Sequence, residues 1–313
     1  MQYMHALKKP KNSDGLIADS NGNVNWRGQW VMLEALSDLG KTLLLSAVPH
    51  SVTNRYRDPK TSQMLLNSSN VLFAVLSNRS PVDTGELSLA IQSLMWYAYA
   101  TNSKGNVGKA AAKIAEFGDK LIAKNNSSAT DNAYAVRGLI EAYRATGNEK
   151  YLDKAAKTFE KLSTQYIAED GYFKGRNAYT INDVAVILGA VNSVKLFAGD
   201  KVNQDRAEQI FKGFFESAVN ISGLQLSAPP KGLAKGKFEQ HHPDIFYAYP
   251  GMAIPPKAGG KYGVAPVFGS EIQWKNGAWE LTNARFNSAG AMHASNEFIW
   301  FHNDEVNGFP EIR

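Results

Sequence analysis

The chain contains no cysteine among its 313 residues. Disulfide bonds, thiolate metal sites, covalent haem attachment and cysteine nucleophiles are therefore excluded. Long apolar runs are also missing, because no stretch approaches the roughly 18 uninterrupted apolar residues that a membrane-spanning helix needs. We therefore expect no membrane span.

The chain has no strong excess of basic or of acidic residues. Lys and Arg total 34 and Asp and Glu total 29, which leaves a formal net charge of +5. The lysines are scattered along the chain, whereas nucleic-acid-binding proteins concentrate basic residues on one face. We therefore expect no nucleic-acid partner. Hydrophobic residues make up 44% of the chain and charged residues 20%, which is typical of a packed globular protein and not of a disordered one.

The N-terminal segment, Met1 to Pro10, lacks the apolar core of a signal peptide, so we expect none within this chain. The abundance of Asn, Ser, Gly and Tyr favours an exported bacterial protein, in the periplasm or outside the cell. An upstream domain or an assembly partner remains an open alternative, because the sequence starts abruptly.

Three stretches repeat one pattern, a glycine turn followed by a helix that opens with a basic residue and an alanine. They are Gly105 to Ala110, Gly147 to Ala155 and Gly199 to Ala207. The pattern recurs at intervals of roughly 50 residues, which is the length of a helical hairpin with its connection. The sequence therefore predicts stacked helix pairs.

Start and stop signals place these helices individually. Asp83-Thr84 with Glu86 is a capping pattern, Thr130 or Asp131 is a candidate cap for the next inner helix, and Thr180 with Asp183 forms a capping box. We predict nine helices, over residues 29–45, 64–76, 87–100, 107–123, 130–145, 151–166, 180–197, 204–219 and 284–301.

The C-terminal third has a different character. Residues 222–269 contain eight of the 26 glycines and seven of the 12 prolines, which predicts a long irregular loop. Residues 271–282 predict a β-hairpin, because Asn276-Gly277 lies between two short segments of strand character. Residues 1–25 predict an extended lead-in. We expect residues 1–313 to form a single, mainly α domain, in which residues 222–282 are an insertion over a cleft.

Several short phrases carry a resemblance to a known superfamily. They are Asp131-Asn132-Ala133, Leu139-Ile140-Glu141-Ala142-Tyr143, Thr146-Gly147-Asn148 and Tyr151-Leu152. Over about residues 84–220 the chain resembles the α/α-toroid proteins, which include six-hairpin glycosidases and the N-acylglucosamine 2-epimerase-like group. The resemblance implies a toroid, complete or incomplete, whose inner helix ends and loops form a sugar-sized cleft. No catalytic motif of any one member of the superfamily is recognisable in this chain.

Carboxylates at helix starts and loop ends are the candidates for acid–base chemistry on a sugar. Glycosidases use two carboxyl groups across the scissile bond, and Asp183, Asp244 and Glu271 are the candidates here. Asp183 also has a structural alternative, as a helix cap. Candidate substrate-binding residues are the aromatic and histidine side chains Trp30, Trp96, Tyr179, His241, His242, Tyr247 and Trp274, for which core packing and loop structure are the alternatives.

His293 and Glu297 form a competing pair. They lie four residues apart in a predicted helix, so their side chains share a face and could act as a base with its orienting partner. A structural hydrogen-bonded pair is the alternative. A metal-dependent enzyme would combine them with His241 and His242, but clustered ligands on one loop are atypical of zinc sites. We therefore predict no metal and no cofactor.

Together these observations predict a carbohydrate-active protein, with glycoside hydrolysis by paired carboxylates as the leading activity. Two alternatives stay open. One is a non-catalytic binding or structural domain of a larger extracellular assembly. The other is the metal-dependent enzyme. The expected ligand is a carbohydrate or another small polar molecule.

Overall fold

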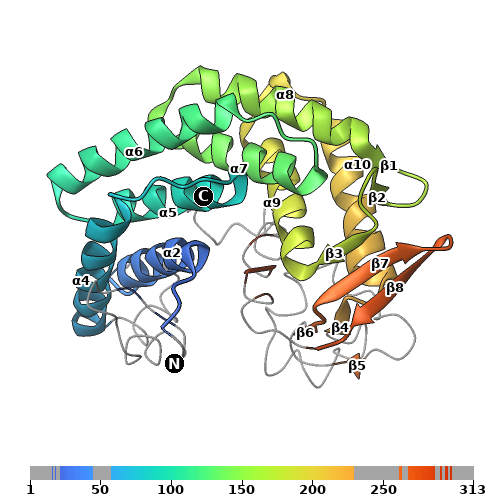
Figure 1. The fold of residues 1–313 in the computed structure, drawn as a ribbon, viewed down its shortest axis with the longest axis horizontal. Helices are drawn as coiled ribbons and strands as arrows, with labels where there is room; N and C mark the ends of the chain where they lie inside the picture. The colour runs from blue at the N-terminus through green and yellow to red at the C-terminus, as the bar shows by residue number, and fades with distance from the viewer. Residues whose placement is uncertain are drawn as a thin grey trace, which may run out of the picture. The chain divides into compact units, whose positions relative to one another are not determined.

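The computed structural model describes residues 22–44, 58–228, 261–262 and 267–285, together with Leu16, Ala18, Gly290, His293, Ala294 and Glu297. These residues are mainly helical (Figure 1). The eight α-helices among them are α2 (Trp26–Thr42), α4 (Pro59–Leu76), α5 (Thr84–Ala100), α6 (Lys104–Ala123), α7 (Ala129–Thr146), α8 (Glu149–Gln165), α9 (Ile181–Phe197) and α10 (Gln204–Phe215). No helix in this part of the chain is both long and apolar enough to cross a membrane.

The chain divides into two compact units, with one boundary in the connection between α6 and α7 and two boundaries inside helices α7 and α8. Unit 1 comprises residues 1–125 and 138–154, and unit 2 comprises residues 126–137 and 155–313. The mainly helical class that the sequence predicts is confirmed. The closure of the helix pairs into one toroid domain stays a prediction.

Unit 1 is built around α5, which packs against α2 and α6. Helix α5 is buried around most of its circumference, whereas α6 buries a single stripe that includes Ile114, Phe117 and Leu121. This difference follows from the sequences, because a helix that is apolar all round is stable only when it is enclosed. Helix α4 also packs against α2.

Unit 2 repeats the contrast between a buried and an amphipathic helix. Helix α9 is enclosed, and α10 packs against it through residues that include Ala207, Ile210 and Phe214. A π-helix, Glu216–Ile221, continues α10. The sheet β3–β7–β8 is antiparallel, with β3 (Ala178–Thr180), β7 (Glu271–Lys275) and β8 (Ala278–Asn283). The short strands are β1 (Tyr166–Ile167), β2 (Tyr172–Phe173), β4 (Gln225–Ala228), β5 (Lys261–Tyr262) and β6 (Val267–Phe268).

The predicted hairpin is confirmed in position and in turn chemistry. Asn276 and Gly277 have φ angles of 52° and 76°. A two-residue hairpin turn with positive φ at both central positions is the type that matches the right-handed twist of its strands. Lys275 and Ala278 pair directly across this turn.

Four helices begin three to five residues earlier than predicted, namely α2 at Trp26, α4 at Pro59, α5 at Thr84 and α6 at Lys104. Helix α6 begins at Lys104, because the Ser103 side chain accepts a hydrogen bond from the Asn106 N–H; Gly105 therefore lies inside the helix and is not a turn. Ser128, and not Thr130 or Asp131, caps α7 by accepting from the Asp131 N–H. Helix α4 begins at Pro59, after the N-cap Asp58, and therefore earlier than expected.

The C-terminal predictions are confirmed only in part. Residues 222–269 include strands β4, β5 and β6, so the irregular loop is interrupted by short pairing segments. The last predicted helix does not begin at Ala284, because residues 284 and 285 have no helical backbone; Gly290, His293 and Ala294 are helical. Most of residues 1–25 and of residues 230–266 lie outside the described residues.

Candidate functional site

A continuous series of aromatic contacts crosses unit 2, and we call it the aromatic ladder. It runs from the β1–β2 pair through α10 to the hairpin. Its ring-centroid distances are Tyr166–Phe173 5.2 Å, Phe173–Phe214 5.1 Å, Phe214–Tyr179 5.5 Å, Tyr179–Trp279 5.7 Å, Trp279–Trp274 5.7 Å and Trp274–Tyr172 5.6 Å. These separations are in the range of favourable aromatic pairs.

Strand register places the ladder's outer members. Trp274 of β7 is directly opposite Trp279 of β8, so the two indoles project from the same face of the hairpin. The Trp279 indole N–H donates to the Asp170 carbonyl at 3.0 Å, which ties the hairpin to the β1–β2 turn. Side chains alternate along a strand, so the buried Ile272 lies on the same face as Trp274.

The ladder is closed at its middle member, Tyr179, and partly open at the end formed by Tyr172 and Trp274. Tyr179 is only 1% exposed; its hydroxyl accepts from the Phe173 N–H at 3.0 Å and donates to the Arg176 carbonyl at 2.9 Å. Burial raises the pKa of the Tyr179 hydroxyl, so it stays a neutral donor. At the open end Tyr172 and Trp274 are partly exposed, and their rings stack with 22° between their planes.

The two predicted carboxylate residues Asp183 and Glu271 are both neighbours of Thr180, at one end of the sheet. Thr180 ends β3, pairs with Glu271 of β7, and is the residue whose capping box Asp183 completes. The Oδ2 atom of Asp183 accepts from the Thr180 N–H at 2.8 Å and from the Arg176 guanidinium at 2.5 Å. The capping alternative for Asp183 is therefore confirmed. Glu271 is exposed.

The two residues of the predicted pair, His293 and Glu297, differ in burial. Glu297 is 4% exposed, and its Oε2 atom accepts from the Arg137 Nε–H at 3.2 Å. Arg137 is 2% exposed and also donates from Nη1 to the Ser193 hydroxyl at 2.8 Å. His293 is only partly buried. Glu297 is therefore the carboxylate of a buried ion pair between residues distant in the sequence.

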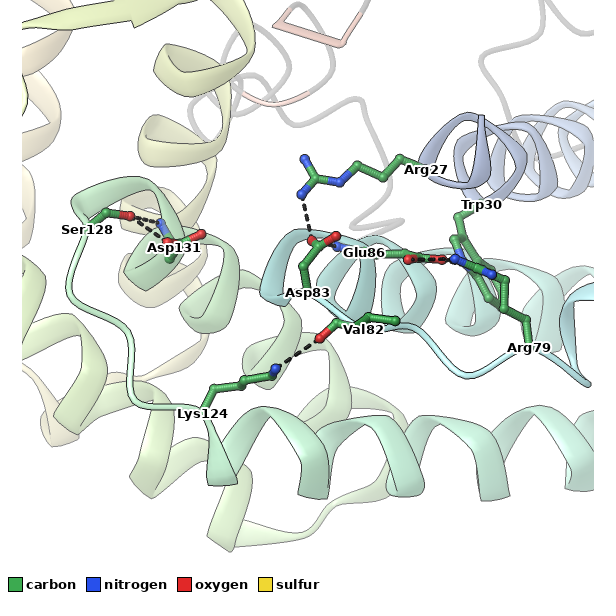
Figure 2. A network of polar contacts seen from close by, with 9 residues as sticks. All are labelled: Arg27, Trp30, Arg79, Val82, Asp83, Glu86, Lys124, Ser128 and Asp131. Atoms are coloured by element: carbon green, nitrogen blue, oxygen red, sulfur yellow. Dashed lines mark hydrogen bonds and ion pairs between the residues drawn. The ribbon is translucent and has the colours of Figure 1, made fainter. Parts of the chain in front are cut away.

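Unit 1 also contains the buried carboxylates of Glu86 and Glu141, and the contacts of Glu86 are shown in Figure 2. Both oxygens of Glu86 accept from Arg79, at 2.5 and 3.0 Å, and Oε1 also accepts from the Trp30 indole N–H at 3.3 Å. Arg79 stacks on the Trp26 ring at 4.1 Å. Nearby, Arg27 donates to the N-cap Asp83 at 2.6 Å. These contacts provide hydrogen-bond donors for both carboxylates at the start of α5.

Three predicted sugar platforms are core residues instead. Trp30 is fully buried and packs edge-on against Phe117 at 6.2 Å, and Trp96 is buried beside Tyr99. Tyr179 lies inside the ladder. A ring enclosed by protein has no face to offer a sugar, so we assign all three to packing. Among the described candidates, Trp274 alone keeps a partly exposed ring.

Four predicted site residues, His241, His242, Asp244 and Tyr247, lie outside the described residues. Within residues 22–44, 58–228 and the later described positions, no group of three or more His, Asp or Glu side chains is placed to hold a metal ion.

Sequence reasoning missed Tyr172 and Arg137. Arg137 has a weak local signal, because its helix-face neighbours at i−4 and i+3, Ala133 and Ile140, are apolar. A buried charge requires a partner, but no local pattern points to residue 297. No model of a known protein family matches the chain, and no curated protein is significantly similar to it.

Proposed function

We propose that this protein binds carbohydrate at the outer end of the aromatic ladder in unit 2. The observation that carries the proposal is the stacked, partly exposed pair Tyr172 and Trp274, whose centroids are 5.6 Å apart. Apolar ring faces supply contact area, and the Tyr hydroxyl and Trp N–H supply polar atoms at the edge. Ligand sites combine apolar walls with a few placed polar groups in this way.

The ladder gives the pair the rigidity that a binding platform needs. Trp274 is supported by Trp279, which is 3% exposed and hydrogen-bonded to the Asp170 carbonyl. A rigid aromatic side chain loses little conformational entropy on binding, so more of the contact energy is retained as affinity. The support by buried rings therefore favours a preformed platform.

Glycoside hydrolysis is the second candidate, and the position of Glu271 and Asp183 on either side of Thr180, at the end of β3 and β7, favours it. Three hydrogen bonds to Asp183 Oδ2, two from Thr180 and one from Arg176, assign that carboxylate to the helix start. Glu271 is exposed and is the better candidate for a carboxylate that meets a substrate.

The binding proposal is tested with Trp274→Ala and Tyr172→Ala in the full chain. The probes are soluble β-glucan, xylan, chitin oligosaccharides and polygalacturonate, and the readouts are calorimetric titration and tryptophan fluorescence. We expect wild type to bind at least one of them, and each variant to bind it at least tenfold more weakly, which is about 1.4 kcal/mol. Trp274→Phe should keep part of the affinity.

Tyr99→Ala is the matched control, because Tyr99 is an exposed aromatic residue of unit 1 that contributes nothing to the ladder. Its affinity should equal that of wild type. Unchanged binding by Trp274→Ala, or no binding of any probe by wild type, would overturn the proposal. For hydrolysis, Glu271→Gln should abolish release of reducing sugar while leaving binding intact.

A further inference from the structure

A lysine borders the stacked pair Tyr172 and Trp274, and strand register places it there. The pairing of β1 with β2 continues one residue beyond β2, because the Lys174 N–H donates to the Gln165 carbonyl at 2.8 Å. Side chains alternate along a strand, so Lys174 lies on the same face as Tyr172, and the buried Phe173 lies on the other. The Cα atoms of Lys174 and Tyr172 are therefore about 7 Å apart, two residues along the strand.

A tight turn fixes the backbone at Lys174. The Arg176 N–H donates to the Phe173 carbonyl at 3.2 Å, and Gly175, the third residue of this turn, has φ of 79°. These are the features of a type II turn, in which glycine adopts the positive φ without strain. The Arg176 guanidinium is held by Asp183, whereas Lys174 is exposed and forms no ion pair with any residue that the structure describes. Lys174 therefore presents its charge to solvent from a fixed point of the backbone.

Asn177 borders the same pair of rings from the side of the sheet. The Trp274 N–H donates to the Asn177 carbonyl at 2.7 Å, directly beyond the paired residues Ala178 and Gln273. The β3–β7 register thus extends by one residue, so Asn177 is opposite Trp274 and its side chain lies on the same face as the indole. Asn177 is exposed, and its amide group can donate to and accept from sugar hydroxyls.

The carboxylates nearest in the sequence belong to the other end of β2. Glu169 and Asp170 lie in the turn between β1 and β2. Gly171, with φ of 69°, interrupts the strand conformation between Asp170 and Tyr172, so alternation does not place the Asp170 side chain on the face of the Tyr172 ring. Strand register therefore places a cation, Lys174, beside that ring.

We propose that the stacked pair Tyr172 and Trp274 binds an acidic sugar, with Lys174 as the partner of its anionic group and Asn177 as a partner of its hydroxyls. The inference rests on the proposed function, because it names the class of sugar that the same two rings bind. The lysine ammonium is a compact point charge that pairs with oxyanions. The ligand is therefore a pyranose that carries a carboxylate or a sulfate.

Matched oligosaccharides test this preference in the full-length protein. One pair is an oligomer of galacturonic acid and its methyl ester, and the other is a sulfated galactan oligosaccharide and its desulfated counterpart. By calorimetric titration, wild type should bind the acidic member of at least one pair about three- to fivefold more tightly, which is the size of an exposed ion pair. The pair that shows the preference identifies the anion. Added sodium chloride should reduce the preference, because salt screens exposed charges.

Three variants assign the preference to one side chain. Lys174→Met removes the charge and keeps the apolar stem, so it should bind the acidic and the neutral member equally while its affinity for the neutral member stays that of wild type. Lys275→Met is the matched control, because Lys275 is also exposed but directly follows Trp274 and so lies on the opposite face of β7. It should keep the full preference. Asp170→Asn should not lower the preference.

The possible failures of the two proposals are distinguishable. A preference that survives Lys174→Met, or an equal loss of preference in Lys275→Met, would overturn the role of Lys174. If wild type binds both members of each pair equally and Trp274→Ala abolishes both, sugar binding stands and the acidic-sugar inference falls. Binding confined to neutral glucan, xylan or chitin probes would have the same meaning. No binding of any probe would overturn both proposals.

Discussion

The two units each bury a glutamate against an arginine, but they do so over very different distances along the chain. In unit 1, Arg79 and Glu86 are seven residues apart, on the connection to α5 and on its first turn. In unit 2, Arg137 and Glu297 are 160 residues apart. The first pair is therefore part of a local helix start, whereas the second depends on tertiary packing between segments 160 residues apart.

The pairs also differ in how completely their partners are removed from water. Arg79 is 24% exposed at its side chain, and Glu86 has a further donor in the Trp30 indole. The Arg137 side chain is 2% exposed. Removing one partner of a buried pair is costly in proportion to how fully the remaining charge is desolvated. The distant pair should therefore lose more stability than the local pair when one partner is removed.

The largest predicted effect follows from this difference. Arg137→Met leaves the Glu297 carboxylate buried without its cation, and should lower the free energy of unfolding by about 3–5 kcal/mol. Arg79→Met leaves Glu86 with the Trp30 N–H and should lower it by about 1–3 kcal/mol. Urea unfolding followed by circular dichroism measures both. A larger loss of unfolding free energy for Arg79→Met than for Arg137→Met would contradict this prediction.

Two glycine-to-alanine substitutions, one in each unit, should change stability in opposite directions. Gly277 of the hairpin has φ of 76°, a conformation that is unfavourable for alanine. Gly277→Ala should therefore destabilise unit 2 by about 1–2 kcal/mol. Gly108 lies within α6 of unit 1 with open space around its Cβ position, so Gly108→Ala should stabilise by about 0.5–1 kcal/mol. Thermal melting of both variants decides whether the signs differ.

The smallest predicted effect concerns pH. Burial opposes ionisation of Asp83, but hydrogen bonds from the Glu86 N–H and from Arg27 outweigh it and hold the pKa of this carboxyl below its ordinary value of 3.8. A lowered folded-state pKa contributes stability that is complete above the ordinary pKa and is lost as pH falls through the folded value.

Asp83→Asn isolates this contribution, because asparagine caps a helix about as well as aspartate. We expect it to lower the free energy of unfolding by less than about 1 kcal/mol at pH 7, and to flatten the loss of stability below pH 4. The control is Ser103→Ala, which removes the uncharged cap of α6. Its difference from wild type should be independent of pH. An equally steep acid transition for Asp83→Asn and wild type would contradict the assignment.

The helices and the hairpin could be predicted because their signals are local. The Asp83 cap, the Thr180–Asp183 capping box and the Asn276-Gly277 turn each act over four residues or fewer, and each is present in the structure. The errors have local causes too. Ser103 and Ser128 are caps that compete with the more conspicuous Gly105 and Thr130.

The candidate site was less accessible to sequence reasoning. Trp274 was identified as an aromatic platform, but nothing near it in the sequence indicated Tyr172, which approaches it only because the β1–β2 turn packs on the hairpin. Trp30 and Tyr179 have the composition of sugar platforms and the burial of core residues. Residue type alone does not distinguish these roles, because exposure is a property of the packed chain.

The sequence by itself determined the mainly helical class, the starts of its best-capped helices and the turn of its hairpin, since hydrogen bonds within a few residues decide those features. Only the tertiary structure decided that Arg137 meets Glu297 and that Trp274 stacks on Tyr172. Such pairings depend on which faces are buried together across more than a hundred residues, and hydrophobic burial, which drives that packing, has no preferred partner or direction.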